Sequence, residues 1–221
     1  MKKTSALCLI SLFLLSGCSS DKENKHLTST VSAAKESSAQ LESAIPAYYK
    51  DYPANPQVID DRTLVQTGQT IRSNKGEASL KKIANLQNSY KTEAIDFKIQ
   101  EAKLITYKPD YSLTDFYHSY THDEQFTIIK FFIEIKNTSA ETRYFAPIAY
   151  LNTDLGEKIT WDQDIYLEDL NTPLKSNETK KGAIGFILEK PNIKSVKINT
   201  SAVFDKKHTQ LAKSKIINIS F

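Results

Sequence analysis

The strongest hydrophobic pattern in the chain runs from Gln125 to Ser139. Alternate positions in it are apolar, at Ile129, Phe131, Ile133 and Ile135, and the positions between them include Lys130, Glu134 and Lys136. A period of two predicts a strand with one face toward a core and the other toward solvent. Such an apolar face is not stable alone, so the pattern also predicts a second sheet that covers it.

Shorter strand patterns flank this central strand. Residues 95–99 alternate apolar with polar, and residues 102–104 continue with the opposite parity, which predicts a β-bulge near Glu101. After a turn at residues 137–141, apolar residues at 144–151 predict a strand that returns beside the central one as a hairpin partner. Pro147 places that returning strand at an edge or a bulge, because proline donates no backbone hydrogen bond.

Three further apolar stretches follow, at residues 182–188, 196–198 and 217–221. No long amphipathic helix separates the predicted strands, which argues against a parallel α/β sheet. About seven short strands with turns between them are typical of an all-β sandwich. We therefore predict an all-β fold in which two antiparallel sheets enclose the core.

The first residues have the pattern of an export signal. Met1 to Lys3 is basic, Ala6 to Leu15 is an uncharged apolar run too short to span a membrane, and small residues precede Cys18. The sequence Leu-Ser-Gly-Cys resembles the bacterial lipobox, which implies cleavage before Cys18 and a diacylglycerol on its sulfur. The alternative is an ordinary secretory signal. Cys8 would leave with the signal, so no free thiol would remain in the mature chain.

Three regions are predicted from these patterns. Residues 1–17 are the lipoprotein signal peptide, and residues 18–57 are the lipidated cysteine and a flexible tether, poor in large apolar residues over its first half. Residues 58–221 form the β-sandwich domain. Tyrosines and prolines at positions 48–56 predict an extended segment that packs on the domain through its rings.

Charge and composition exclude several classes of function. The formal charge is +3, and it becomes +1 when Lys2 and Lys3 leave with the signal. Such a balance argues against nucleic acid as a partner, because phosphate binding needs a concentrated basic surface. The six glycines form no phosphate-binding loop, and no cofactor is predicted. Neither a free cysteine nor a Gly-x-Ser-x-Gly motif is present after residue 18, so we expect no enzyme.

Four blocks of sequence resemble a known family. In order, residues 131–139, 151–158, 174–182 and 185–191 are similar to recurring blocks of immunoglobulin-like domains in bacterial surface lipoproteins, chiefly of Gram-positive organisms. The resemblance covers roughly residues 95–221, and it implies an immunoglobulin-like sandwich of largely uncharacterised function with no catalytic residues to transfer. Asn177 stands where the family usually has glycine, although asparagine also tolerates the left-handed conformation.

Two groups of polar residues could hold a metal. His118 and His122 have helical i, i+4 spacing and could bind zinc with Asp123 or Glu124, but the pattern lacks the glutamate of the zincin motif. A second group could offer oxygen ligands to calcium without the EF-hand spacing: Asp162, Asp164, Glu168 and Asp169. A solvated loop is the alternative in both cases, and we predict no metal.

Aromatic residues are concentrated in a long connection between two predicted strands. These are Tyr107, Tyr111, Phe116, Tyr117 and Tyr120. They could form a binding surface, because tyrosine provides amphipathic contact area at low entropic cost. Alternatively, the rings plug the open end of the sandwich. Alanine variants distinguish the two, since only plug residues should be needed for stability.

Together these patterns predict a lipid-anchored protein on the extracytoplasmic face of the cell membrane. It would act as a non-catalytic binding or interaction module, with the bilayer contacted through the lipid on Cys18 and a protein or another envelope component as partner. The alternative is a metal- or small-ligand-binding lipoprotein that serves a transporter.

Overall fold

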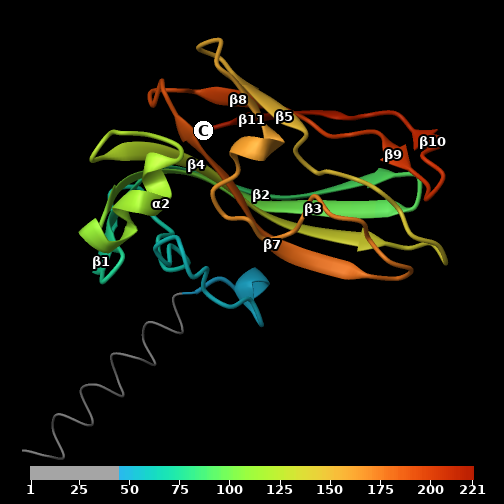
Figure 1. Cartoon of the computed structure of the whole chain (residues 1–221), viewed down its shortest axis with the longest axis horizontal. Helices are drawn as coiled ribbons and strands as arrows, with labels where there is room; N and C mark the ends of the chain where they lie inside the picture. The colour runs from blue at the N-terminus through green and yellow to red at the C-terminus, as the bar shows by residue number, and fades with distance from the viewer. Residues whose placement is uncertain (1–44) are drawn as a thin grey trace, which may run out of the picture. The chain divides into compact units, whose positions relative to one another are not determined.

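The computed structural model describes residues 45–221. The regular secondary structure of this part of the chain is almost entirely β-strand, and its two large antiparallel sheets face each other (Figure 1). The predicted all-β sandwich-like fold is therefore confirmed. Cys18, the signal peptide and most of the predicted tether lie outside the described residues, so those predictions stay as they are. No helix in residues 45–221 is long and apolar enough to cross a membrane.

The larger sheet has five strands in the order β1-β2-β3-β4-β7. Their bounds are β1 (Thr70–Ser73), β2 (Gly76–Thr92), β3 (Ile95–Pro109), β4 (Phe126–Asn137) and β7 (Thr179–Leu188). The predicted central strand is β4, and it pairs with β3 on one side and β7 on the other. The register of β3 against β4 shifts between Ile99 and Glu101, which confirms the predicted bulge.

The second sheet has four strands in the order β11-β8-β5-β6. Their bounds are β11 (Ile216–Ser220), β8 (Ser195–Asn199), β5 (Tyr150–Thr153) and β6 (Lys158–Thr160), and β9 (Val203–Phe204) pairs separately with β10 (Gln210–Ala212). The described residues thus contain eleven strands. Several have only two to four residues, too few for their alternation to be recognised in the sequence.

The segment predicted as the hairpin partner of β4 belongs to the other sheet. β5 pairs with β6 and β8, whereas β7 occupies the place beside β4. The chain crosses between sheets over residues 138–149, a stretch that includes Pro147. Because proline cannot donate to a ladder, it suits this crossing segment better than a paired strand.

Short helices complete the described part: η1 (Ala47–Tyr49), η2 (Tyr111–Leu113), α2 (Thr114–His118) and η3 (Trp161–Gln163). The space between the sheets is filled by the predicted face of β4, with Ile129, Phe131, Ile133 and Ile135 all fully buried. This face assignment is confirmed.

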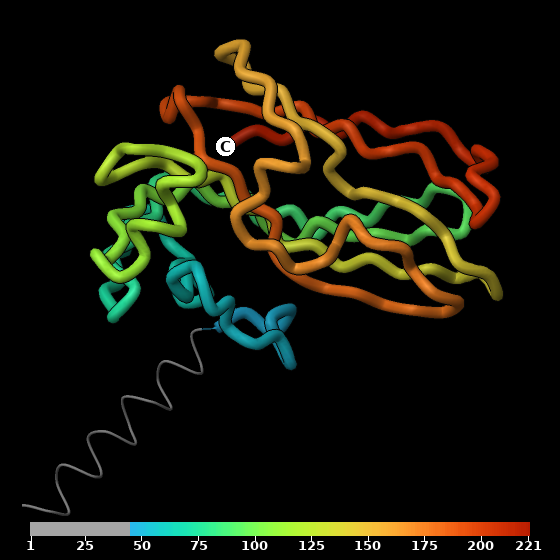
Figure 2. The backbone as a smooth tube through the Cα atoms, in the orientation of Figure 1, coloured from blue at the N-terminus to red at the C-terminus, as the bar shows by residue number. Residues whose placement is uncertain are grey.

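The opposite face of β4 is also covered, which the alternation did not predict. Ile128, Lys130 and Phe132 are at most 1% exposed, and only Lys136 near the strand end is exposed as expected. The N-terminal segment, residues 45–66, lies against this face of the five-stranded sheet, on the side away from the four-stranded sheet (Figure 2). Its rings and apolar side chains build a second core there.

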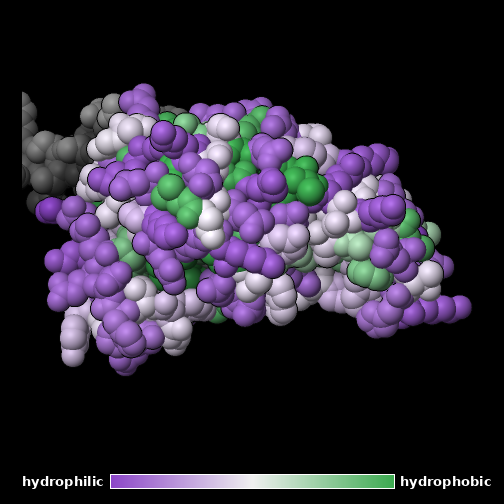
Figure 3. Space-filling view, turned by 90° about the horizontal axis from the view of Figure 1, so that it is seen from above, coloured by the Kyte–Doolittle hydropathy of each residue, from purple (hydrophilic) through white to green (hydrophobic). Residues whose placement is uncertain are grey.

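The packed region therefore begins before Val58, the predicted boundary of the domain. Tyr49 is 2% exposed and Tyr52 is 8% exposed, with both rings against Phe132. This is the packing through tyrosine rings that the sequence indicated, but residues 45–57 are part of the folded unit rather than of a flexible tether. On the face drawn in Figure 3, hydrophilic residues surround small separate apolar patches.

Candidate functional site

The five predicted aromatic residues do not form one surface. Tyr107 is fully buried at the end of β3 and Tyr117 in α2 is 2% exposed, and their rings meet edge to face at 5.4 Å between centroids. Burial raises the pKa of Tyr107 to about 12. Phe116 and Tyr120 are half-buried against the same core. Packing thus accounts for four of the five, whereas the ring of Tyr111, a residue that is 90% exposed, lies in solvent.

The two histidines lie together at the surface. Their rings are 5.4 Å apart between centroids, and both line a hollow of about 460 Å³ with Tyr111, Asp123 and Glu124. Among the described residues, however, no three His, Cys, Asp or Glu side chains converge closely enough to hold a metal ion. The zinc and transporter alternatives therefore have only this histidine pair as support.

A cluster of four buried charges lies between the N-terminal segment and the five-stranded sheet. We refer to Asp61, Glu101, Lys103 and Lys130 as the ion cluster; none is more than 3% exposed. The Lys103 ammonium is 3.0 Å from the Asp61 carboxylate and 2.9 Å from that of Glu101. Lys130 is 2.6 Å from Asp61. Two positive and two negative groups thus compensate each other out of contact with water.

Hydroxyl groups complete the coordination of the ion cluster. Tyr48 and Tyr49 each donate a hydrogen bond to the Glu101 carboxylate, and Lys130 donates to the Tyr49 hydroxyl at 2.7 Å. Burial alone would raise the pKa of Asp61, but the ammonium groups of Lys103 and Lys130 outweigh it and lower this pKa to about 2. The cluster therefore fastens the N-terminal segment to the sheet and is closed to a substrate.

The sequence contains one signal of this cluster. The bulge at Glu101 places Glu101 and Lys103 on the face of β3 that continues the Lys130 face of β4, and Lys103 lies directly opposite Lys130. Two like charges opposite each other across a ladder are destabilising unless counter-charges join them. This pairing could have indicated that acidic groups must cover that face, but Asp61 is too distant in sequence to be identified from the pattern.

The four acidic residues considered for calcium do not converge either. Asp162 and Asp169 are exposed, whereas Asp164 and Glu168 cap the outer edge of β7. The Gly185 amide donates to Asp164 Oδ1 at 2.9 Å, and the Ala183 amide donates to Glu168 Oε2 at 2.8 Å. Burial raises the pKa of Asp164 to about 6 despite these backbone donors. Asp164 and Glu168 thus provide hydrogen-bond acceptors for backbone amides at the free edge of β7.

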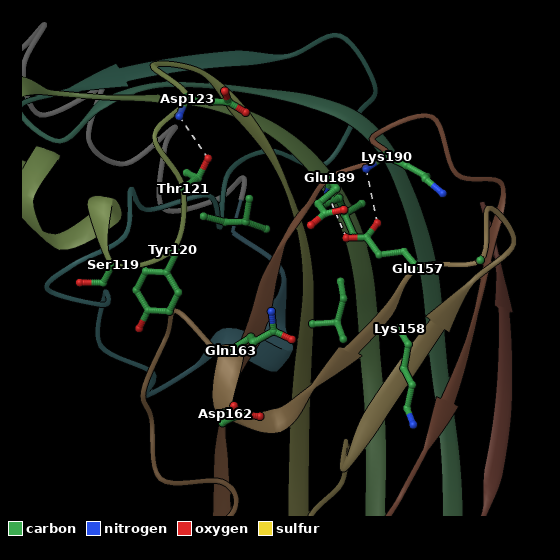
Figure 4. A pocket seen from close by; sticks show the side chains of 14 residues that line it. Ser119, Tyr120, Thr121, Asp123, Glu157, Lys158, Asp162, Gln163, Glu189 and Lys190 are labelled. Atoms are coloured by element: carbon green, nitrogen blue, oxygen red, sulfur yellow. Dashed lines mark hydrogen bonds between the residues drawn. The ribbon is translucent and has the colours of Figure 1, made fainter.

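A polar hollow lies beside this edge, and we refer to it as the edge cleft. It has a volume of about 720 Å³. Figure 4 shows Tyr120 and the following loop on one side, Lys158 of β6 on the other, and η3 with Asp162 and Gln163 between them. Glu157, Ile187, Glu189 and Lys190 also line it. Both β6 and β7 are the last strands of their sheets, so the cleft lies between two sheet edges.

Within the edge cleft, one backbone position of β7 has no partner among the described residues. Alternate residues direct their N–H and C=O groups to the same side of a strand. The backbone groups of Ile187 therefore point to the free edge of β7, as those of Ala183 and Gly185 do. Carboxylates of Glu168, Asp164 and Glu157 accept from the outward amides of Ala183, Gly185 and Glu189. The Ile187 amide between them has no such acceptor within residues 45–221, and Ile187 is one of the residues that line the cleft.

Fold and site together define a β-sandwich with a covered outer sheet face and a polar cleft between its sheet edges. The chain is 37% identical over 233 residues to the uncharacterised protein YdhF of Bacillus subtilis (strain 168), across 96% of this chain and 97% of that protein. It therefore belongs to the YdhF family. No family model matches the chain, so the similarity to immunoglobulin-like lipoprotein domains remains a prediction.

Two solved structures have partial similarity. A functionally unknown protein from Listeria monocytogenes EGD-e matches with a TM-score of 0.47 and 12% identity, over 66% of this chain and 88% of that chain. A conserved hypothetical protein from Bacillus anthracis matches with a TM-score of 0.32 and 12% identity, over 62% and 90% of the two chains.

Proposed function

We propose that the protein is a non-catalytic binding module of the cell envelope, held at the membrane by a lipid on Cys18, and that the edge cleft is its binding site. The observation that carries this proposal is the cleft itself. Its volume of about 720 Å³ lies within the range of about 300–1,000 Å³ typical of ligand sites. The charged groups around it are open to solvent, whereas the ion cluster is buried and already neutralised by its own members.

The membrane anchor is supported by the sequence pattern that ends at Cys18. Because each buried acyl CH₂ contributes about 0.8 kcal/mol, a two-chain lipid anchors a protein stably where one chain would not. We expect the Cys18→Ala variant to be released into the medium or to accumulate unprocessed. Fractionation of cells that produce either form measures this directly. Full retention of a correctly processed Cys18→Ala protein would contradict the lipid anchor.

The binding role is tested by photo-crosslinking in intact cells. A photoreactive amino acid at Ser119, an exposed residue on the wall of the edge cleft, is expected to capture a specific neighbour, identified by mass spectrometry. The matched control carries the same probe at Lys206, an exposed position in the β9–β10 connection at the other end of the sandwich (Figure 1). Capture only at Lys206, or at neither position, would contradict the assignment of the cleft.

A further inference from the structure

The edge of β7 is capped by carboxylates at every outward amide from Ala183 to Glu189 except Ile187. A sheet edge with free N–H and C=O groups can pair with another strand, and proteins commonly block such edges. Here the blocking is interrupted where the edge cleft opens. The N–H and C=O of Ile187 lie on the same side, so they match a partner that offers one acceptor and one donor at strand spacing.

The opposite wall has a similar position. The backbone carbonyl of Glu157 accepts from the Thr153 amide, and the Trp161 amide donates to the Ala149 carbonyl. The alternate residues 157, 159 and 161 therefore direct their backbone groups toward β5. Lys158 and Thr160 therefore face away from β5, and the Thr160 amide is capped by Gln163. The backbone groups of Lys158 have no partner within residues 45–221, and Lys158 lines the cleft. Both walls thus offer one uncapped strand position to an occupant.

The charges of the edge cleft determine which occupant fits. Four carboxylates line it, from Asp123, Glu157, Asp162 and Glu189, against the two ammonium groups of Lys158 and Lys190. This formal excess of two negative charges disfavours an anion, although the Ile187 amide needs an acceptor. A neutral peptide carbonyl satisfies that amide without adding negative charge, and basic side chains on the same peptide would neutralise the cleft.

We propose that the edge cleft binds an extended peptide segment of a partner protein, rich in basic side chains, which adds as a short strand to the edge of β7 at Ile187. Strand addition draws affinity from main-chain hydrogen bonds and specificity from the alternate side chains. The peptide carbonyl accepts from the Ile187 N–H, and a peptide N–H donates to the Ile187 carbonyl. This inference rests on the proposed function and names the chemical class of its partner.

The test uses NMR spectroscopy of the full-length, ¹⁵N-labelled protein in detergent micelles. In the free protein the Ile187 amide is expected to exchange with solvent at least tenfold faster than those of Ala183 and Gly185. A blocked TKVKT pentapeptide should slow that exchange at least tenfold and shift the Ile187 resonance. A blocked TEVET pentapeptide should bind at least tenfold more weakly, and a chitin tetrasaccharide should leave the resonance unchanged.

A charge-reversal pair gives a matched control on exposed positions. Asp162→Lys, inside the edge cleft, should weaken TKVKT binding at least tenfold, whereas Asp115→Lys, an exposed acidic residue of α2 outside the cleft, should leave it unchanged. Slow exchange of Ile187 in the free protein, equal binding of the two peptides, or a response only to the saccharide would overturn the peptide assignment. Such a result together with a crosslink at Ser119 would leave the proposed function intact, whereas absence of the crosslink counts against the function itself.

Discussion

Replacing Phe131 by Asp is expected to abolish cooperative folding. Phe131 is fully buried in the middle of β4, between Ala102 of β3 and Ile184 of β7, with its ring in the core between the sheets. Removing a buried phenylalanine side chain costs about 3–5 kcal/mol, and an unpaired buried carboxylate adds several more. Domains of ordinary stability have about 5–15 kcal/mol in total. Circular dichroism should therefore show no thermal transition.

The matched control for Phe131→Asp is Lys136→Asp. Lys136 lies on the same strand but is exposed, so its substitution should change the free energy of unfolding by only about 0.5 kcal/mol. If the two variants melt at the same temperature, the face assignment of β4 and the packing of the two sheets are both wrong.

Much of the fold could be predicted because strand alternation is a local signal. The inward face of β4 and the bulge at Glu101 follow directly from the parity of apolar residues. Strand partners are not local. The segment around Tyr150 looked like a hairpin partner of β4 because it follows it in sequence, whereas the partner in space is β7, more than forty residues downstream of β4. Alternation gives the faces of a strand but not its neighbours.

The covering of the outer sheet face was harder to predict for a related reason. Lys130 reads as a solvent-facing residue when β4 is considered alone, since charged side chains are almost never fully buried unless paired. Its partner Asp61 lies in an irregular segment without periodicity, so no pattern joins the two. The aromatic residues before β4 show the converse: their clustering was visible, but only the structure distinguishes the buried Tyr117 from the exposed Tyr111.

The edge cleft could not be predicted because it depends on which strands end each sheet. Ile187 and Lys158 are ordinary strand residues in the sequence, and neither belongs to a recognisable motif. In the sequence, Asp164 and Glu168 are candidate oxygen ligands for calcium. In the structure, they accept hydrogen bonds from backbone amides of β7 instead. Neither the calcium hypothesis nor the solvated-loop alternative predicted that these carboxylates accept hydrogen bonds from backbone amides of β7.

The ion cluster carries the second large prediction: Asp61→Asn should destabilise the protein by about 3–5 kcal/mol, the range for removing one partner of a buried ion pair. The variant leaves the ammonium groups of Lys103 and Lys130 with Glu101 as the one remaining carboxylate of the ion cluster. Denaturant unfolding measures the loss. The control is Asp60→Asn, whose half-exposed ion pair with Arg62 should contribute at most about 1 kcal/mol.

Two further measurements separate loss of charge from loss of packing in Asp61→Asn. A double variant with Lys103→Met removes one uncompensated ammonium and should be more stable than Asp61→Asn alone, because replacing both partners of a buried pair is often near neutral. The pH dependence gives a second readout. Since the folded pKa of Asp61 is lowered from 3.8 to about 2, its contribution is fully present above pH 4 and disappears as the pH falls toward 2. The wild type should therefore lose stability across that interval more steeply than Asp61→Asn. Parallel curves, together with a double variant less stable than Asp61→Asn, would mean that Asp61 stabilises the N-terminal segment through shape alone.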